Sequence, residues 1–476
     1  MYKHGDLLVR NRIFMGRSRF VAILSAAVTL SACGQQGQAE EAETTFGANG
    51  SGNRVETPDP SNNDKLAAIS LGYVSSENSR VECFGRLMFD VPGGMPFDWA
   101  IPYKASNQDT FDNLIQYFEN GTGKGRIEIE TKELLTTFAI YGPVTQELRE
   151  KFLGYRARMN AASLSGLLSA LKQQKKTEDM YKERPELLGP GIKEHVAEER
   201  ARLEKDVAEI KADRYQKAID LGRENSMALR HDQRRGGASY LRGAIVLGNH
   251  LVAFESMLKG DIPQFEEPSE VQWQVAENAL RKLVGQLQPR NLYEIPKDRG
   301  FCLPYAFLRD DGTYGNKIST SFRFGDSPAV IYTLSVAAIP GGGASETTIL
   351  NATGRSATGL LSQLPENTTV KQRLGPRPAK IGALTSEQGG IVVEAKRPGQ
   401  PSREGYHVYT GYAGWAGSQI LPTIEVVMES AARASYPKLT KDAPPYEQAR
   451  PRLDALLKSI RLRPTTPPMP ELVGIQ

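Results

Sequence analysis

The sequence predicts an α+β fold with two domains, each an antiparallel-rich sheet with packed helices, plus a long charged helical segment in the first domain. Runs of strand-forming residues bounded by turn residues occur in both halves of the chain. Segments with apolar residues at helical spacing lie between these runs. The 476 residues also exceed what one hydrophobic core usually serves, which favours two domains.

Residues 1–32 have the pattern of a secretory signal peptide. Arg17 and Arg19 precede an apolar run that ends at Leu30, and small residues and Cys33 follow it. The run is too short to span a bilayer, which needs about 20 apolar residues. Leu30-Ser-Ala-Cys33 resembles the bacterial lipoprotein box, so we expect cleavage before Cys33 and acylation of that cysteine. The alternative is a buried apolar helix in which the cysteine falls by chance.

The residues around this signal lead to three further expectations. Gly34 stands where Asp would retain a lipoprotein in the inner membrane, so we expect a periplasmic protein that is lipid-anchored to the outer membrane. Met15 directly precedes the signal, so a start at Met1 or at Met15 fits the pattern. Residues 33–64 contain almost no large apolar side chain and are predicted to form a flexible tether.

The net charge of the mature chain argues against a nucleic-acid partner. The whole chain carries a formal charge of +4, and residues 1–32 hold five basic residues against one acidic residue. The chain without its signal is therefore close to neutral, and it lacks the net positive field that steers nucleic acids to a protein.

The first domain, residues 65–288, begins with alternating and helical patterns. A strand is predicted over residues 79–91, and apolar residues at helical spacing predict a helix over residues 109–119. Glycines then turn the chain into a strand over residues 126–130. Residues 163–224 are rich in Ala, Leu, Lys, Glu and Arg, and Pro185 and Pro190 are expected to divide them into two helices.

The second of these helices is expected to be amphipathic and about 45 Å long. Its apolar stripe comprises Val196, Leu203, Val207, Ile210, Ala218 and Leu221.

The remaining elements of the first domain are a hairpin and a helix. Gly248-Asn249 suits a tight turn between strands over residues 238–247 and 250–257. Ser269 is predicted to cap a helix that runs to about residue 286. Pro289 follows, and the domain boundary is placed there.

The second domain, residues 289–476, is rich in predicted strands. The hairpin sequence Gly325-Asp-Ser-Pro328 separates strands over residues 318–324 and 329–336. Further strands are predicted over residues 390–395, 405–412 and 423–428, and helices over residues 354–364 and 446–460.

Cys83 and Cys302 are the only cysteines besides Cys33. In an oxidising compartment they can form a disulfide that joins the starts of the two domains, and such a bridge would contribute about 4 to 5 kcal/mol in the chain-entropy model. Two separately buried thiols are an equal alternative, because cysteine is among the most buried residue types.

Local motifs for catalysis or cofactor binding are missing from the sequence. None of the five histidines stands at metal-ligand spacing from another histidine or a cysteine, so no metal site is predicted. Gly354-Arg-Ser-Ala-Thr358 lacks the final glycine of a nucleophile elbow. The glycines at 121, 123 and 125 precede no phosphate-binding motif. We therefore expect no cofactor and no catalytic residue.

An aromatic cluster offers a candidate contact surface for a protein partner. Tyr406, Tyr409, Tyr412 and Trp415 alternate with glycines, and aromatic residues in glycine-rich loops are frequent interface anchors. The alternative is that aromatic residues of a strand fill the core.

Short motifs along the chain resemble one bacterial family when taken in order. The first half contains Cys83-Phe-Gly-Arg86 and Met88-Phe-Asp-Val-Pro92. The second half contains Arg299-Gly-Phe-Cys302, Phe322-Arg-Phe324, Gly405-Tyr-His-Val-Tyr409 with Trp415, Leu421-Pro-Thr-Ile-Glu-Val426 and Ser459-Ile-Arg-Leu-Arg-Pro464. They resemble the immunity proteins that protect against the fourth family of type VI secretion lipase effectors. Glu429-Ser430 and the helical segment 163–224 depart from that pattern.

The resemblance implies an inhibitor rather than an enzyme. Its partner would be a cognate phospholipase effector in the periplasm, and both domains would be immunity domains that clamp the lid or the active-site entrance of the lipase. Two alternatives stay open: an envelope lipoprotein with a structural or assembly role, and a periplasmic hydrolase whose site is assembled from distant residues.

Overall fold

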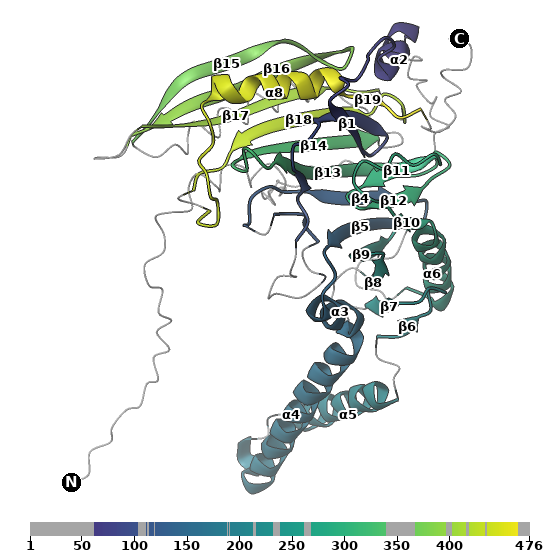
Figure 1. The fold of residues 1–476 in the computed structure, drawn as a ribbon. Coiled ribbons are helices and arrows are strands. Elements are labelled where there is room, and N and C mark those ends of the chain that lie inside the picture. Colours follow the sequence, from purple (N-terminus) through teal and green to yellow (C-terminus); the bar gives the residue numbers. More distant parts are fainter. Residues whose placement is uncertain are drawn as a thin grey trace, which may run out of the picture.

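The computed structural model describes residues 61–102, 111, 114–118, 120–187, 189, 191–212, 216–231, 239–260, 268–338, 367–396, 402–415, 418–433 and 436–464. The expected signal peptide, Cys33 and most of the expected tether lie outside the described residues, and so does the helix expected over residues 354–364. Within the described residues, a 13-stranded antiparallel sheet forms the body of the molecule (Figure 1). The predicted α+β class is confirmed.

The strands and helices have the following bounds. Strands of the first half are β1 (Ser79–Phe84), β2 (Leu87–Pro92), β3 (Phe97–Trp99), β4 (Arg126–Glu130), β5 (Leu134–Tyr141), β6 (Ala218–Ile219), β7 (Ser226–His231), β8 (Tyr240–Leu247) and β9 (His250–Leu258). Strands of the second half are β10 (Leu287–Pro289), β11 (Gly300–Leu303), β12 (Ala306–Arg309), β13 (Gly315–Phe324), β14 (Val330–Ala338), β15 (Thr368–Ile381), β16 (Leu384–Ala395), β17 (Arg403–Tyr412), β18 (Thr423–Ser430) and β19 (Arg461–Leu462). The helices are α2 (Asn62–Ile69), α3 (Gln146–Leu153), α4 (Tyr155–Glu183), α5 (Ile192–Lys211), α6 (Glu270–Gly285) and α8 (Tyr446–Ser459).

The large sheet joins both halves of the chain. Its strand order is β15-β16-β17-β18-β14-β13-β4-β5-β9-β8-β7-β6, with β3 paired to one end of β13. The junction is the antiparallel pair of β4 and β13, in which Ile127 faces Ile318 and Ile129 faces Asn316. The domain boundary placed at residue 289 therefore falls inside a continuous sheet, and the division into residues 65–288 and 289–476 stays a prediction.

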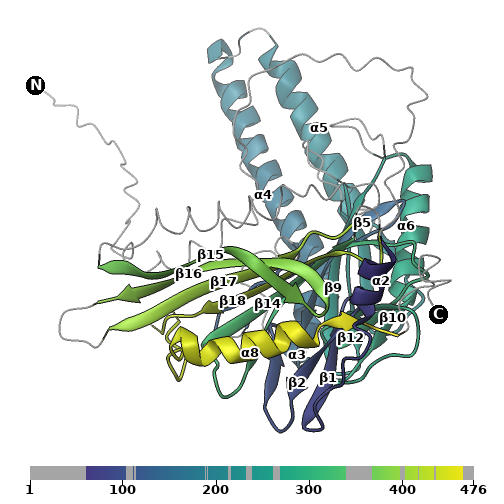
Figure 2. The ribbon, with the colours of Figure 1, turned by 90° about the horizontal axis from the view of Figure 1, so that it is seen from above.

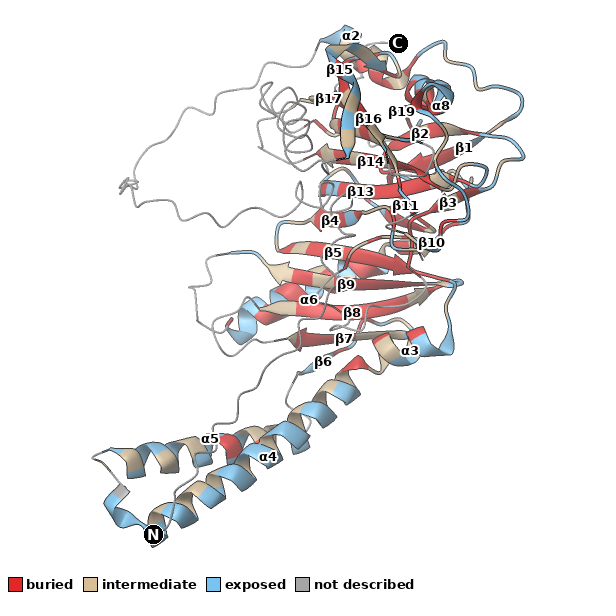
Figure 3. Cartoon of the chain, turned by 90° about the vertical axis from the view of Figure 1, so that its left-hand side faces the viewer, coloured by how far each residue is buried: buried red, intermediate tan, exposed pale blue. Residues whose placement is uncertain are grey.

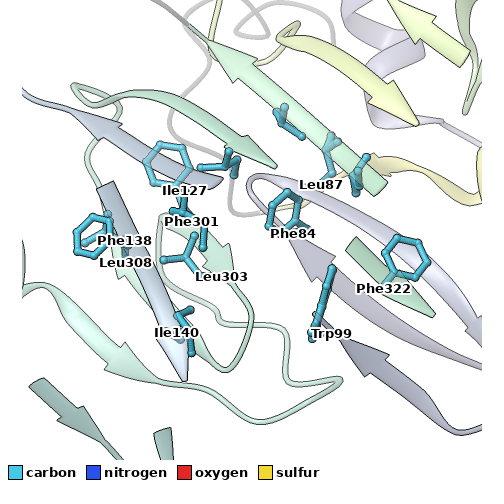
Figure 4. Packing of buried hydrophobic residues seen from close by; sticks show 14 of the residues in the cluster. Phe84, Leu87, Trp99, Ile127, Phe138, Ile140, Phe301, Leu303, Leu308 and Phe322 are labelled. Carbon is cyan, nitrogen blue, oxygen red and sulfur yellow. The ribbon is translucent and has the colours of Figure 1, made fainter. Parts of the chain in front are cut away.

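The main hydrophobic core lies on one face of this sheet. Helix α6 packs there on β5 and β8, and α8 packs on β15 and β17. Figure 4 shows Ile127 of β4, Phe138 of β5, Phe301 of β11 and Phe322 of β13 in one cluster. The opposite face has a smaller core, in which Phe152 of α3 contacts side chains of β5, β8 and β9. The strands are mostly buried in Figure 3, in contrast to the exposed α4 and α5.

Two small sheets lie against the large one, and a disulfide joins the two small sheets to each other. Strands β1, β2 and β19 form one of them, and β10, β12 and β11 form the other. Gly85 and Cys302 exchange two backbone hydrogen bonds of 2.7 and 2.8 Å between these sheets. Cys83 and Cys302 are fully buried and form a disulfide. Of the two alternatives that the sequence left open, the structure therefore has the disulfide and not two separate thiols.

Buried ion pairs connect the same two sheets. Arg290 donates to Glu82 over 2.6 Å, and both side chains have no exposed surface. Glu82 also accepts hydrogen bonds from the backbone N–H groups of Cys83 and Tyr293. Arg86 pairs with Asp310 in the same buried region. Burial lowers the pKa of Arg86 to about 10, because desolvation there outweighs the attraction of the carboxylate.

Several elements predicted from local patterns are confirmed. The turn at Gly248-Asn249 joins β8 and β9, and Gly248 has a φ of +58°, which suits glycine. Ser269 and Gln272 form a capping box at the start of α6. The strands and the helix expected between residues 390 and 460 appear as β16, β17, β18 and α8, with shifted ends.

Four other predictions need correction. The single strand expected over residues 79–91 is a hairpin of β1 and β2 that turns at Gly85 and Arg86. The described residues of segment 109–119 are not helical, because Gln116 forms a β-bridge with Gly125 and the apolar side chains pack from an irregular loop. The second amphipathic helix ends at Lys211, so its 20 residues span about 30 Å and not 45 Å. Ala218 at the end of the expected stripe lies in strand β6. Several strands, among them β5, β7, β11, β12 and β15, were not expected from the sequence.

Candidate partner-binding surfaces

The structure divides the four predicted aromatic contact residues between the two faces of the sheet. Side chains of β17 alternate, so Tyr406 and Tyr412 face the main core, where they are 4% and 7% exposed. Trp415 is partly buried against the same core. Tyr409 points to the opposite face of the sheet and keeps some exposed surface. The structure therefore does not bring these residues into one exposed patch, and the burial of Tyr406 and Tyr412 favours a packing role for them.

A group of polar side chains surrounds Tyr409 on that opposite face. The register of β17 and β18 places His407 directly across from Glu429 and Tyr409 across from Val427. Glu425 lies two residues from Val427 on β18, on the same face of the sheet. His407 Nδ1 lies 3.7 Å from Glu429 Oε2, and the two side chains are 20% and 16% exposed. We call His407, Tyr409, Glu425 and Glu429 the β17–β18 polar cluster.

The titration of this cluster is shifted by burial. Desolvation raises the pKa of Glu425, although the Tyr409 hydroxyl stabilises its carboxylate. Desolvation also raises the pKa of Tyr409, and the nearby Glu425 carboxylate adds to that shift. The cluster thus presents donors and acceptors from a rigid sheet, and such groups can fix the orientation of a bound protein. Tyr409 was expected from the sequence and the other three residues were not, although strict alternation in both strands places them on the same face as Tyr409.

The geometry of the polar cluster gives no support to nucleophilic catalysis. In the described ranges, His407 Nδ1 has a carboxylate neighbour at 3.7 Å, but no hydroxyl or thiol donates a hydrogen bond to it. A hydrolase of the serine type needs such a hydroxyl next to its base. The described part of the chain also contains no group of three or more metal-ligating side chains.

A second candidate surface is the antiparallel helix pair α4 and α5, here called the α4–α5 hairpin. It projects from the body of the molecule next to α3 (Figures 1 and 2). Leu203, Val207 and Ile210 of α5 are buried against α4, and Gln174 Nε2 donates to the backbone oxygen of Val196 over 2.9 Å. Tyr155 anchors the base of α4 in the smaller core.

The two helices of this hairpin differ in charge. Residues 160–171 of α4 carry no charged side chain, although many of them are exposed and Leu168 is 46% exposed. Helix α5 carries charges along its whole exposed face, including the pair of Arg200 and Glu204. Protein interfaces are depleted of charge at their centres. The uncharged part of α4 is therefore the side of the hairpin better suited to contact another protein.

The anchor predicted at the N-terminus cannot be placed on the fold, because Cys33 lies outside the described residues. Among the described helices, none combines the length and the apolar character that crossing a bilayer requires.

Comparison with known proteins supports the resemblance that the motifs indicated. Residues 294–465 match the family model described as Tle cognate immunity protein 4 C-terminal domain. The matched range contains every strand from β11 to β19 together with α8. No curated protein matches the chain. The resemblance to the lipase immunity family is thus confirmed over the C-terminal part of the chain.

Three solved structures that contain immunity proteins are among those that match the chain. The immunity protein TplEi of the type VI secretion system of Pseudomonas aeruginosa, complexed with "L" peptide, is 15% identical, with a TM-score of 0.42 and coverage of 82% of this chain and 100% of that chain. Its apo structure is 14% identical, with a TM-score of 0.43 and coverage of 82% and 98%. A Tle4-Tli4 complex gives 15% identity, a TM-score of 0.44 and coverage of 83% and 100%.

Proposed function

We propose that this chain, whose residues 294–465 match an immunity-protein domain, is a periplasmic immunity lipoprotein that binds and inhibits a cognate type VI secretion phospholipase effector. The observation that carries the proposal is this family match. Of the matched strands, β13 to β18 form one sheet with β4 and β5 of the first half, so the chain would present a single rigid body to its partner. Its action is binding, and no step of catalysis is assigned to it.

Inhibition would follow from preferential binding to one state of the lipase. Many lipases and other enzymes with lids alternate between closed and open forms, and a protein that binds the closed form shifts that equilibrium by its differential affinity. Clamping of the lid or of the active-site entrance is therefore the mechanism that we propose. A lipid anchor at Cys33 would add to inhibition by raising the local concentration of the inhibitor at the membrane.

Two observations support a location in the periplasm. Residues 17–33 have the signal and lipoprotein pattern that leads to export and acylation. The disulfide between Cys83 and Cys302 fits an oxidising compartment, because such bonds are rare in the reducing cytosol. Together they support a tethered protein on the periplasmic side of the outer membrane.

Co-expression tests the proposal. The candidate cognate lipase would be expressed with export to the periplasm of a heterologous bacterium, alone or with this protein. We expect the lipase to kill the cells, the full chain to restore survival, and the two proteins to co-purify. A version without residues 1–32, which stays in the cytosol, should not protect. Killing by the lipase in the presence of correctly exported full chain would contradict the proposal.

A further inference from the structure

A groove with a volume of about 550 Å³ lies between β15 and α8, at the end of the large sheet. Figure 2 shows α8 alongside the β15–β17 end of the sheet. Its lining includes the apolar Pro378 and Leu457 and the basic Arg377, Lys380 and Lys458. The volume is within the range of sites that bind drug-sized ligands. We call this site the β15–α8 groove.

The arrangement around Arg377 orients a positive charge without neutralising it. The Nε and Nη2 groups of Arg377 donate to Gln388 Oε1 over 3.2 and 2.5 Å. Gln388 is 4% exposed, and its Nε2 donates to Thr410 Oγ1 over 3.0 Å, which fixes the amide. A neutral amide thus occupies the position where a carboxylate would normally pair with the guanidinium. Gln388 is the hydrogen-bond partner of Arg377 among the described residues. The remaining N–H groups of the Arg377 guanidinium can therefore bind a planar oxyanion.

The backbone of β15 contributes to this arrangement. The pairing of β15 with β16 shifts register between Leu374 and Arg377, across Gly375 and Pro376. Such bulges bend a strand and change the direction of its side chains, and they are common beside functional sites. The irregularity therefore coincides with the residue whose side chain lines the groove.

The charge of the groove is positive overall. Within the described residues, neither Arg377 nor Lys380 nor Lys458 forms an ion pair. Asp454 is the acidic residue in the lining, and its carboxylate lies 3.5 Å from Arg450 of the same helix. Three cations against one partly paired carboxylate make an anionic occupant favourable.

We propose that the β15–α8 groove binds an acidic segment of the cognate effector, with an Asp or Glu carboxylate of that segment on the Arg377 guanidinium. The inference rests on the proposed function, because it names the part of the partner that this site would take. The apolar walls formed by Pro378 and Leu457 favour a peptide over a free inorganic anion, because they can pack against backbone and side-chain carbon atoms.

Binding of the purified effector to the full chain, measured by calorimetry, tests the inference. Arg377→Gln should weaken binding at least about tenfold, which is roughly 1.4 kcal/mol. Lys458→Gln, at an exposed position, should weaken it in the same direction, and Asp454→Asn should strengthen it by removing repulsion. A purely structural role of these residues would not give opposite signs at Lys458 and Asp454. Lys132→Gln, at an exposed lysine in the turn between β4 and β5, is the matched control.

The outcomes distinguish this inference from the proposed function. Binding of the effector to wild type with equal affinity for all groove variants would overturn the inference and leave the immunity function standing. No binding of the effector to wild type would overturn both. Weaker binding by Arg377→Gln and Lys458→Gln, together with a reduced dependence of affinity on salt, would support the inference, because exposed charges lose their effect as ionic strength rises.

Discussion

At the scale of single residues, the structure concentrates its buried charges at the contact between the two small sheets. Glu82 accepts three hydrogen bonds there, one from Arg290 and two from backbone N–H groups. Arg463, close to the C-terminal end of the described chain, donates to the backbone oxygens of Gly300, Pro296 and Asp298. Except for the bond from the Cys83 N–H to Glu82, these contacts connect residues more than 150 positions apart, and sequence patterns gave no indication of them.

Replacement of Glu82 tests the importance of this buried network. Glu82→Gln leaves the Arg290 guanidinium charged without a counter-charge in a site that water does not reach. We expect a loss of roughly 3 to 5 kcal/mol in the free energy of unfolding, measured by urea denaturation. The control is Asp298→Asn, which breaks an exposed pair with Arg309 and should cost no more than about 1 kcal/mol. Equal effects of the two substitutions would contradict this assignment.

His250 makes the stability of the protein depend on pH. Its ring stacks on Tyr305 at 4.1 Å between centroids, and burial lowers its pKa from 6.5 to about 4. Between these two pH values the unfolded chain binds more protons than the folded chain, so stability decreases as the pH falls from 6.5 to 4.

Urea denaturation at several pH values measures this effect. His250→Gln removes the titrating ring, so its stability should fall less steeply than that of wild type between pH 6.5 and pH 4. His195→Gln, at an exposed position on α5, should keep the steep dependence of the wild type. An unchanged slope in His250→Gln would contradict the effect of burial.

At the scale of elements, local signals predicted the structure well where the stabilising contacts are local. The β8–β9 hairpin and the cap of α6 depend on residues that are adjacent in the sequence, so their patterns were sufficient. Segment 109–119 has helical spacing, but its apolar side chains are satisfied by packing against distant strands. Strand β15 contains Gly375, Pro376 and Pro378, which are typical of loops, and at a sheet edge they are tolerated.

The candidate binding surfaces could be predicted less well from the sequence than the strands and helices. The aromatic set was visible as composition, but its division between two faces depends on which side of β17 meets the core. The β15–α8 groove joins residues about 80 positions apart, and its oriented guanidinium depends on a buried Gln388 that carries no motif. Such sites arise from tertiary packing, and a single sequence does not report it.

The α4–α5 hairpin should unfold independently of the sheet. Its seam contains few buried side chains, so local opening needs little free energy compared with global unfolding. Leu203→Asp places a charge in that seam and should increase amide hydrogen exchange across residues 192–211, while exchange in β8 and β9 stays slow. Ala201→Asp, at an exposed position of the same helix, should leave the exchange of α5 nearly unchanged. Faster exchange in β8 and β9 of Leu203→Asp would show that the hairpin is coupled to the sheet.

At the scale of the whole molecule, the sheet and the disulfide act on the same connection between the two halves. Strands β4 and β13 bring the first and second halves into one sheet, and Cys83 and Cys302 are joined across a separation of 219 residues. Closing so long a loop reduces the entropy of the unfolded chain. Apart from the α4–α5 hairpin, the protein should therefore unfold in one cooperative transition that involves both halves.

Removal of the disulfide measures its contribution. The double variant Cys83→Ala and Cys302→Ala should lose about 5 kcal/mol in the free energy of unfolding in the chain-entropy model. A reducing agent should destabilise wild type but leave the double variant unaffected, which separates the loss of the bond from the loss of side-chain packing. Wild type that keeps its full stability after complete reduction would contradict the stabilising role of the bridge.

We propose that this chain inhibits a phospholipase by occupying it. The most direct measurement is the turnover of phospholipid vesicles by the purified cognate effector, titrated with the purified folded chain. We predict that turnover falls to background near one equivalent of the chain, because a stable complex removes one lipase molecule for each inhibitor molecule. Undiminished turnover in the presence of a large excess of the folded chain would contradict the account.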